Sequence, residues 1–188
     1  MSAPAVGEER ASIEVNRDGH PLIRPLDPRD AHHLADLFGR LSPTSRHLRY
    51  LAPMTTLPAG HLRHFAAVDH QAHEAVGAFE AGELVGAAHY FRSSEQPRQA
   101  ETAVEVADVH QQHGLGRRLL VELARLARDR GITHFTAIAL AENPGVRGML
   151  RQPRWPTTTH TDGAEIFLMM RLLPPEACFP WQQVGQAS

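Results

Sequence analysis

The chain has 188 residues, 42% of them hydrophobic, and its 19 Lys and Arg against 21 Asp and Glu give a net charge of −2. This balance gives no reason to expect a nucleic-acid or anionic-membrane partner, and no apolar run approaches the roughly 18 residues that a membrane span needs. A single cysteine excludes an internal disulfide and fits a reducing compartment, so we expect a cytoplasmic protein. We expect it to be a monomer or a homodimer.

The organisation of the chain predicts one domain at residues 12–174. Its length suits a single hydrophobic core, and no internal repeat or low-complexity linker divides it. Residues 1–11 are polar and acidic and are expected to form a flexible tail. A second tail is expected at 175–188, because two consecutive prolines close the last predicted strand.

The N-terminal half of the chain is typical of a hairpin, three helices and a second hairpin. Asp27 is a helix N-cap followed by Pro28 at the first helical position. In chain order the predicted elements are strands at 12–15 and 22–24, helices at 27–40, from Pro43 and at 58–68, and strands at 75–79 and 84–91.

The C-terminal half begins with a predicted strand at 100–109, in which Glu101 and Glu105 lie on the face opposite Thr102, Val104 and Val106. A glycine-containing loop and a long amphipathic helix follow, and Gly131 supplies the helix C-cap. The next strand, at 132–140, completes a strand-helix-strand unit whose two strands should run parallel. A short helix at 143–152 and a strand at 163–172 are the last predicted elements.

The loop at 111–116, Gln-Gln-His-Gly-Leu-Gly, is the most informative feature of the sequence. It opens a helix, where free backbone N–H groups and the positive end of the helix dipole form an anion site suited to a pyrophosphate. A Walker loop would need Lys-Ser/Thr after the second glycine, and Arg117-Arg118 stand there instead. A dinucleotide fold would need a third glycine where Leu119 stands.

The pattern Gln-x-x-Gly-x-Gly after a strand resembles the acetyl-CoA loop of the GNAT family of N-acetyltransferases. The resemblance covers about residues 12–172, including Ala-Glu-Thr-Ala-Val at 100–104 and Ala-Glu-Asn at 141–143. Residues 41–50 and 68–70 are similar to the bacterial protein-lysine acetyltransferase branch. The resemblance implies an α/β (α+β) fold with a mixed, mostly antiparallel sheet of six to seven strands and about four flanking helices. The parallel strands at 100–109 and 132–140 would splay apart to admit the cofactor.

The resemblance also implies the cofactor site and the chemistry. Acetyl-CoA would be the co-substrate, its pyrophosphate held by the loop and its pantetheine arm paired with the strand before the loop. A backbone N–H near Val106 would stabilise the developing oxyanion. The residues expected to contact the cofactor are Val106, Ala107, Asp108, Val109, Gln111, Gln112, His113, Gly114, Leu115, Gly116, Arg117 and Asn143.

A protonated lysine acceptor needs a base, and Glu101 aligns with the catalytic carboxylate that some family members carry on this strand. Partial burial beside the cofactor is expected to raise its pKa toward neutrality. Glu105, about 13 Å further along the same face, is the second candidate, and His110 is the third. Cys178 lies outside the motif region, so direct attack in a ternary complex is expected rather than an acetyl-cysteine route.

Several features depart from the family pattern. Leu150 stands where many relatives carry a tyrosine acid, Arg154-Trp155 replaces the usual Gly-Phe, and Gln111 replaces the commoner arginine. Two alternatives to a protein-lysine acceptor therefore stay open, a small-amine (aminoglycoside-like) acetyltransferase and a non-catalytic acyl-CoA-binding regulatory module. The thirteen histidines are scattered without a ligand pattern, so we expect no metal.

Overall fold

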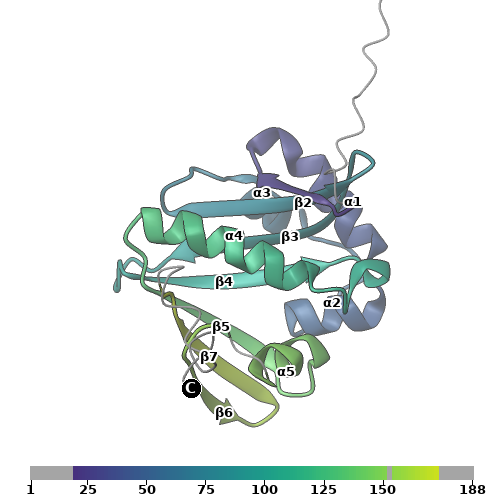
Figure 1. Cartoon of the computed structure of the whole chain (residues 1–188). Coiled ribbons are helices and arrows are strands. Elements are labelled where there is room, and N and C mark those ends of the chain that lie inside the picture. The colour runs from purple at the N-terminus through teal and green to yellow at the C-terminus, as the bar shows by residue number, and fades with distance from the viewer. Residues whose placement is uncertain (1–18, 152–153, 174–188) are drawn as a thin grey trace, which may run out of the picture.

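The computed structural model describes residues 19–151 and 154–173, which form a seven-stranded sheet in the order β1-β2-β3-β4-β5-β7-β6 (Figure 1). Every neighbouring pair is antiparallel except β4 and β5. The mixed, mostly antiparallel fold is therefore confirmed, with five α-helices against about four expected. The strands are β1 (Leu22–Pro25), β2 (His73–Glu80), β3 (Glu83–Arg92), β4 (Gln99–Val106), β5 (His134–Leu140), β6 (Thr157–Asp162) and β7 (Glu165–Arg171). The helices are α1 (Ala31–Arg40), α2 (Pro43–Tyr50), α3 (Ala59–Ala66), α4 (Leu115–Asp129) and α5 (Pro144–Arg151).

Two hydrophobic cores lie on opposite faces of the sheet. Figure 1 shows α4 in front of β2 to β4 and α1 behind them. The apolar stripe of α4, which includes Leu119 and Leu123, packs with Val76, Tyr90 and Phe135 of the strands. Behind the sheet, residues of α1 and α3 pack on the opposite face of β2 and β3. The sheet is thus covered on both faces over β1 to β4.

The parallel strands β4 and β5 pair at their beginnings and then separate. The paired positions are Gln99 with His134, Ala100 with Phe135, and Glu101 with Thr136, although β4 continues to Val106 and β5 to Leu140. The expected splay is present, and it opens directly after Glu101.

The strand before the glycine loop ends earlier than predicted. It stops at Val106 rather than Val109, and Asp108–His110 form a 3-10 turn. The Asp108 carboxylate accepts a hydrogen bond from the Ser42 backbone N–H at 2.6 Å, which holds the turn against the start of α2. Val109 lies in this turn and is 80% exposed, so it gains no packing that would favour continuing the strand.

The two ends of the fold show one confirmed and one missed element. Asp27 caps the 3-10 turn Pro28–Asp30 that leads into α1, with its side chain accepting from the Arg29 N–H, as the Asp27-Pro28 pair predicted. The prediction gave one final strand at 163–172, whereas the chain forms a hairpin of β6 and β7 that turns at Gly163. The predicted strand at 12–15 and both predicted tails, 1–11 and 175–188, lie outside the described residues.

No helix in the described parts of the chain is long and apolar enough to cross a membrane.

Candidate functional site

The loop before α4 presents a row of free backbone N–H groups. Within the described residues, the five N–H groups from Gln112 to Gly116 have no backbone acceptor, and the first bond of the helix runs from Arg118 N to Gly114 O at 3.1 Å. Gln112 and Gly114 both adopt left-handed backbone conformations, with φ of 63° and 79°. Alternation of left-handed and other conformations turns successive N–H groups toward one concavity that suits an anion. We call residues 112–116 the N–H cradle.

A polar brace fixes the turn that carries the cradle. The Gln111 amide donates to Val106 O, Asp108 Oδ1 and Ser45 Oγ at 3.0, 2.9 and 3.1 Å. Asp108 also accepts from the Ser45 hydroxyl and the Ser42 N–H. Burial would raise the pKa of Asp108, but the hydrogen bonds from Ser45, Ser42 and Gln111 outweigh it and hold that pKa below its usual value. Asp108 and Gln111, both predicted to contact the cofactor, are thus engaged within the protein and position the cradle.

Glu101 lies where the two parallel strands part. It is the last residue of β4 paired with β5, and its side chain is exposed on the face of the sheet opposite α4. No hydrogen bond or ion pair reaches its carboxylate from the part of the chain that the structure describes. The protein alone does not supply the partial burial that the sequence suggested for Glu101.

Glu105, on the same face, is held inside a polar cluster. It is 8% exposed, accepts a hydrogen bond from the Tyr50 hydroxyl at 3.0 Å, and lies 3.6 Å from Arg49 Nε. Burial and the neighbouring Glu105 raise the pKa of Tyr50 well above its ordinary value, so Tyr50 is a hydrogen-bond donor. Arg49 also lies 3.0 Å from His89 Nε2, and burial holds the pKa of His89 well below its usual value. A neutral His89 accepts this bond.

Sequence reasoning missed the other three members of the cluster around Glu105. Tyr50 and Arg49 belong to α2, and His89 belongs to β3. No sequence spacing links them, because packing of α2 on β4 brings together residues 55 positions apart.

The other predicted residues occupy diverse places. Asn143 caps α5 through its Oδ1, which accepts from the N–H groups of Gly145 and Val146 at 2.9 and 3.3 Å. The His110 ring, the third candidate base, lies 2.8 Å from the Glu80 carboxylate at the end of β2. Ala107 and Leu115 are buried, so their side chains anchor the two ends of the turn, whereas Gln112, His113 and Arg117 are exposed on its outer side.

Among the described residues, the sheet face that continues from Glu101 onto β5 and β7 exposes apolar side chains. Three large apolar side chains there, Ile138, Phe167 and Met169, are 44%, 37% and 39% exposed. Ile138 pairs with Phe167, and Thr136 pairs with both Met169 and Glu101. Since paired residues share a face, these side chains form one surface that continues to Glu101. We call Ile138, Phe167 and Met169 the apolar face.

No group of three or more His, Cys, Asp or Glu side chains that could hold a metal ion occurs among the described residues.

Comparison with known proteins agrees with this geometry. The family model described as the acetyltransferase (GNAT) family matches residues 38–152. The chain is 34% identical over 153 residues to Acetyltransferase PA5475 of Pseudomonas aeruginosa, covering 79% of this chain and 82% of that relative. Among solved structures, the GNAT domain of S. lividans PAT is 27% identical with a TM-score of 0.75, covering 83% of this chain and 93% of that one. The structure of yncA from Salmonella typhimurium with its cofactor acetyl-CoA is 21% identical with a TM-score of 0.65, over 80% of this chain and 93% of that one.

Proposed function

This chain belongs to the acetyltransferase (GNAT) family, and from that premise we propose that it transfers the acetyl group of acetyl-CoA to the side chain of a protein lysine. Family and relatives identify an acetyl-CoA-dependent N-acetyltransferase. The proposal concerns which residues of this chain carry that reaction and which amine receives the group.

The N–H cradle is the proposed holder of the CoA pyrophosphate. Its N–H groups lie at the positive end of the dipole of α4, a helix of 15 residues, where phosphate groups bind favourably. The oxygens of the Asp108 carboxylate are engaged by Ser42, Ser45 and Gln111, so they do not occupy the N–H groups of the cradle. The residues present therefore fit the group.

The gap between β4 and β5 is the proposed path of the pantetheine arm. The Ala107 N–H is bonded to Val85 O of β3 at 2.9 Å. Because successive N–H groups of a strand point to opposite sides, the Val106 N–H points away from β3 and into the gap. There it can donate to the carbonyl oxygen of the thioester that acetyl-CoA supplies. Asn143 follows β5 by three residues and caps α5 with its Oδ1, and its amide nitrogen is proposed to border the same gap.

Glu101 is the proposed general base, and its position at the opening of the gap carries the proposal. A lysine ammonium has an ordinary pKa of about 10.4 and must lose a proton before its nitrogen can attack. Glu101 has no partner among the described residues and can accept that proton directly or through a water. Glu105 is committed to Tyr50 and Arg49 and is assigned a positioning role.

The surroundings of Glu101 support a macromolecular acceptor. Glu101 is exposed at the edge of the apolar face rather than enclosed. An exposed apolar surface beside a polar group is typical of a protein-binding site, whereas small ligands are usually held in concave sites that cover most of their surface.

The test is thiol release from acetyl-CoA in the presence of lysine-containing proteins, lysine peptides or small amines. For Glu101→Gln we expect turnover to fall about 100-fold or more, with the Kd for acetyl-CoA unchanged. Glu95→Gln, which alters another exposed carboxylate, is the matched control and should keep wild-type turnover. Unchanged turnover in Glu101→Gln would remove this residue from the mechanism. Faster acetylation of small amines than of any lysine substrate would overturn the acceptor, and tight acetyl-CoA binding without any thiol release would indicate a non-catalytic binding module.

A further inference from the structure

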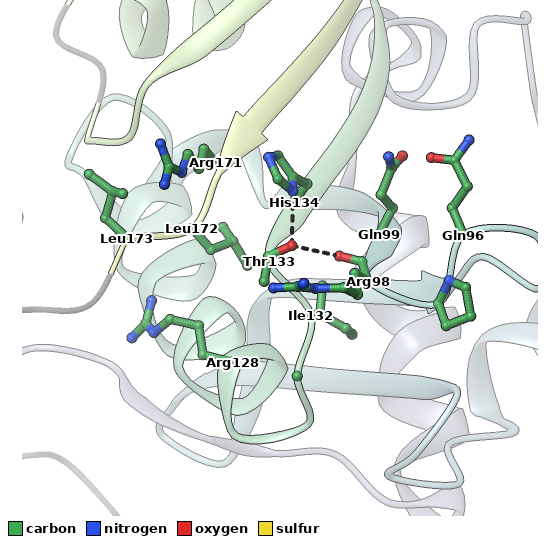
Figure 2. A pocket seen from close by; sticks show the side chains of 12 residues that line it. Gln96, Arg98, Gln99, Arg128, Ile132, Thr133, His134, Arg171, Leu172 and Leu173 are labelled. Carbon is green, nitrogen blue, oxygen red and sulfur yellow. Dashed lines mark hydrogen bonds between the residues drawn. The ribbon is translucent and has the colours of Figure 1, made fainter.

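A second hollow lies at the end of the molecule opposite the N–H cradle (Figure 2). It has a volume of about 750 Å³ and is formed where β4 and β5 begin and where α4 and β7 end. Since α4 has 15 residues, the hollow and the cradle are separated by about 22 Å along the helix. The hollow is therefore no part of the cofactor site.

The polar wall of this hollow is positively charged. Arg98, Arg128 and Arg171 line it together with His134, and its lining contains no Asp or Glu. The three arginines come from different segments, the loop before β4, the last turn of α4 and the end of β7, and Figure 2 shows them around the hollow. Within the described residues, none of the three guanidinium groups has a hydrogen bond or an ion pair.

The three arginines gather in one hollow although the chain is slightly acidic. The net charge is −2, and several other arginines pair with acids, as Arg125 does with Glu122 at 2.7 Å and Arg130 does with Glu74 at 2.9 Å. One arginine in the last turn of a helix has an ordinary explanation, because it complements the helix dipole. That explanation applies to Arg128 alone, since Arg98 and Arg171 do not belong to a helix.

The remaining walls are apolar or neutral. Ile132, Leu172 and Leu173 form one side, Pro97 forms another, and the amides of Gln96 and Gln99 stand at the rim. The volume falls in the range of about 300–1,000 Å³ that is typical of small-molecule sites. Guanidinium groups match the oxygen geometry of phosphate, and apolar walls accept a carbon body.

We propose that this hollow, which we call the arginine pocket, binds a small organic phosphate whose phosphate group contacts Arg98, Arg128 and Arg171. The apolar or aromatic body of the ligand packs on Pro97 and Leu173, which are accessible, whereas Ile132 and Leu172 beneath them are 1% and 5% exposed. The pocket joins the paired beginnings of β4 and β5, whereas the cofactor gap opens at their far ends. Its occupant is thus a second ligand, bound at the same time as CoA.

The experiment uses the full chain saturated with CoA, so that the cradle is filled before any second ligand is added. Calorimetric titrations with AMP, adenosine and inorganic phosphate then report on the arginine pocket alone. We expect AMP to bind and adenosine to bind at least about ten-fold more weakly, because one charge-assisted contact is worth roughly 1.5–3 kcal/mol. Inorganic phosphate should also be weaker than AMP, because it lacks the apolar body.

Three arginine variants give the residue-level test. Arg98→Ala and Arg128→Ala should each weaken AMP binding about ten-fold or more, whereas Arg63→Ala, the same change on the exposed face of α3, should leave it within two-fold. The thermal midpoint and the Kd for CoA should stay unchanged in all three, which separates this result from misfolding and from failure of the proposed cofactor site. Absence of AMP binding to the CoA-saturated protein, equal binding of adenosine and AMP, or equal affinity in Arg63→Ala and Arg128→Ala would each overturn the proposal.

Discussion

Replacing Gly114 with alanine isolates the contribution of the left-handed backbone in the N–H cradle. Gly114 has φ of 79°, and a Cβ built on it meets no atom within 4 Å. The substitution therefore introduces no clash, and its effect comes from backbone strain of about 1–2 kcal/mol for a non-glycine residue in this conformation. Any part of that strain which the free loop relieves by changing its conformation must be restored when the ligand binds.

The expected result divides between stability and affinity. The free energy of unfolding should fall by up to about 1–2 kcal/mol, which lowers the thermal midpoint by about 2–8 °C in a domain of this size. To the extent that the free loop relaxes, the Kd for acetyl-CoA should rise by up to about 5- to 30-fold. Calorimetry of unfolding and of acetyl-CoA binding measures both quantities on the same variant.

Gly131→Ala is the matched control. Gly131 ends the same helix, has φ of 77°, and likewise has no atom within 4 Å of an added Cβ. Its substitution should lower the thermal midpoint by a similar amount while leaving the Kd for acetyl-CoA as in the wild type. The assignment of the cradle would be refuted if the two variants bound acetyl-CoA equally well while Gly114→Ala lost less stability than Gly131→Ala.

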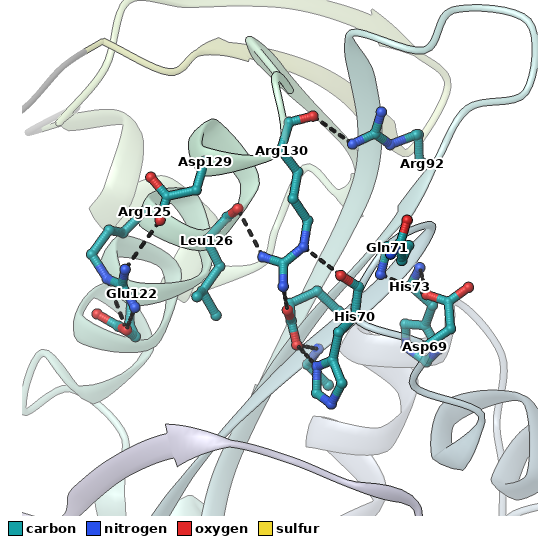
Figure 3. Close-up of polar contacts among 12 residues, drawn as sticks. Asp69, His70, Gln71, His73, Arg92, Glu122, Arg125, Leu126, Asp129 and Arg130 are labelled. Atoms are coloured by element: carbon teal, nitrogen blue, oxygen red, sulfur yellow. Dashed lines mark hydrogen bonds and ion pairs between the residues drawn. The ribbon is translucent and has the colours of Figure 1, made fainter.

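Three further changes test the packing and the buried charges. Glu74→Gln should lower the free energy of unfolding, measured in urea, by about 3 kcal/mol. Glu74 is 1% exposed, and its replacement would leave Arg130 without its buried counter-ion. Figure 3 shows that Arg130 also donates to the His70 backbone. Burial lowers the pKa of His89 in the folded state, so the unfolded chain binds one more proton as the pH falls. The free energy of unfolding should therefore drop by about 1.4 kcal/mol between pH 7.5 and 5.5. The same pH dependence in His89→Gln as in the wild type would contradict this. Leu123→Ala should lower the free energy of unfolding by about 2–5 kcal/mol, because Leu123 is fully buried on the inner face of α4. A decrease below about 1 kcal/mol in thermal unfolding would contradict this packing.

The elements around the cradle could be predicted because local signals agree there. The leucine stripe of α4, the glycines before it and Gly131 after it each indicate the same helix, and the structure confirms the strand-helix-strand unit with parallel β4 and β5. Local propensity, periodicity and capping are all encoded within a short segment. The proposed binding of an anion by the loop rests on the same segment, since it depends on backbone geometry rather than on distant side chains.

Elements defined by distant contacts could not be predicted. β6 reads Thr-Thr-Thr-His-Thr-Asp, is almost wholly exposed and pairs with β7 alone, so it carries none of the apolar alternation that marks a strand. The end of β4 at Val106 depends on Asp108 meeting Ser42, which the chain brings together only when α2 packs beside the turn. The cluster around Glu105 has the same origin, and it distinguishes the two candidate bases more clearly than sequence position does.

The central claim, that the N–H cradle holds the cofactor while the gap after Glu101 admits its acetyl arm, is tested most directly by amide NMR shifts. Acetyl-CoA is titrated into the isotopically labelled protein, and backbone N–H resonances are followed to saturation. We expect the largest changes at Gln112 to Gly116 and at Val106, because these N–H groups gain acceptors. Saturable changes that spare residues 112–116, or that centre on the arginine pocket, would contradict the account.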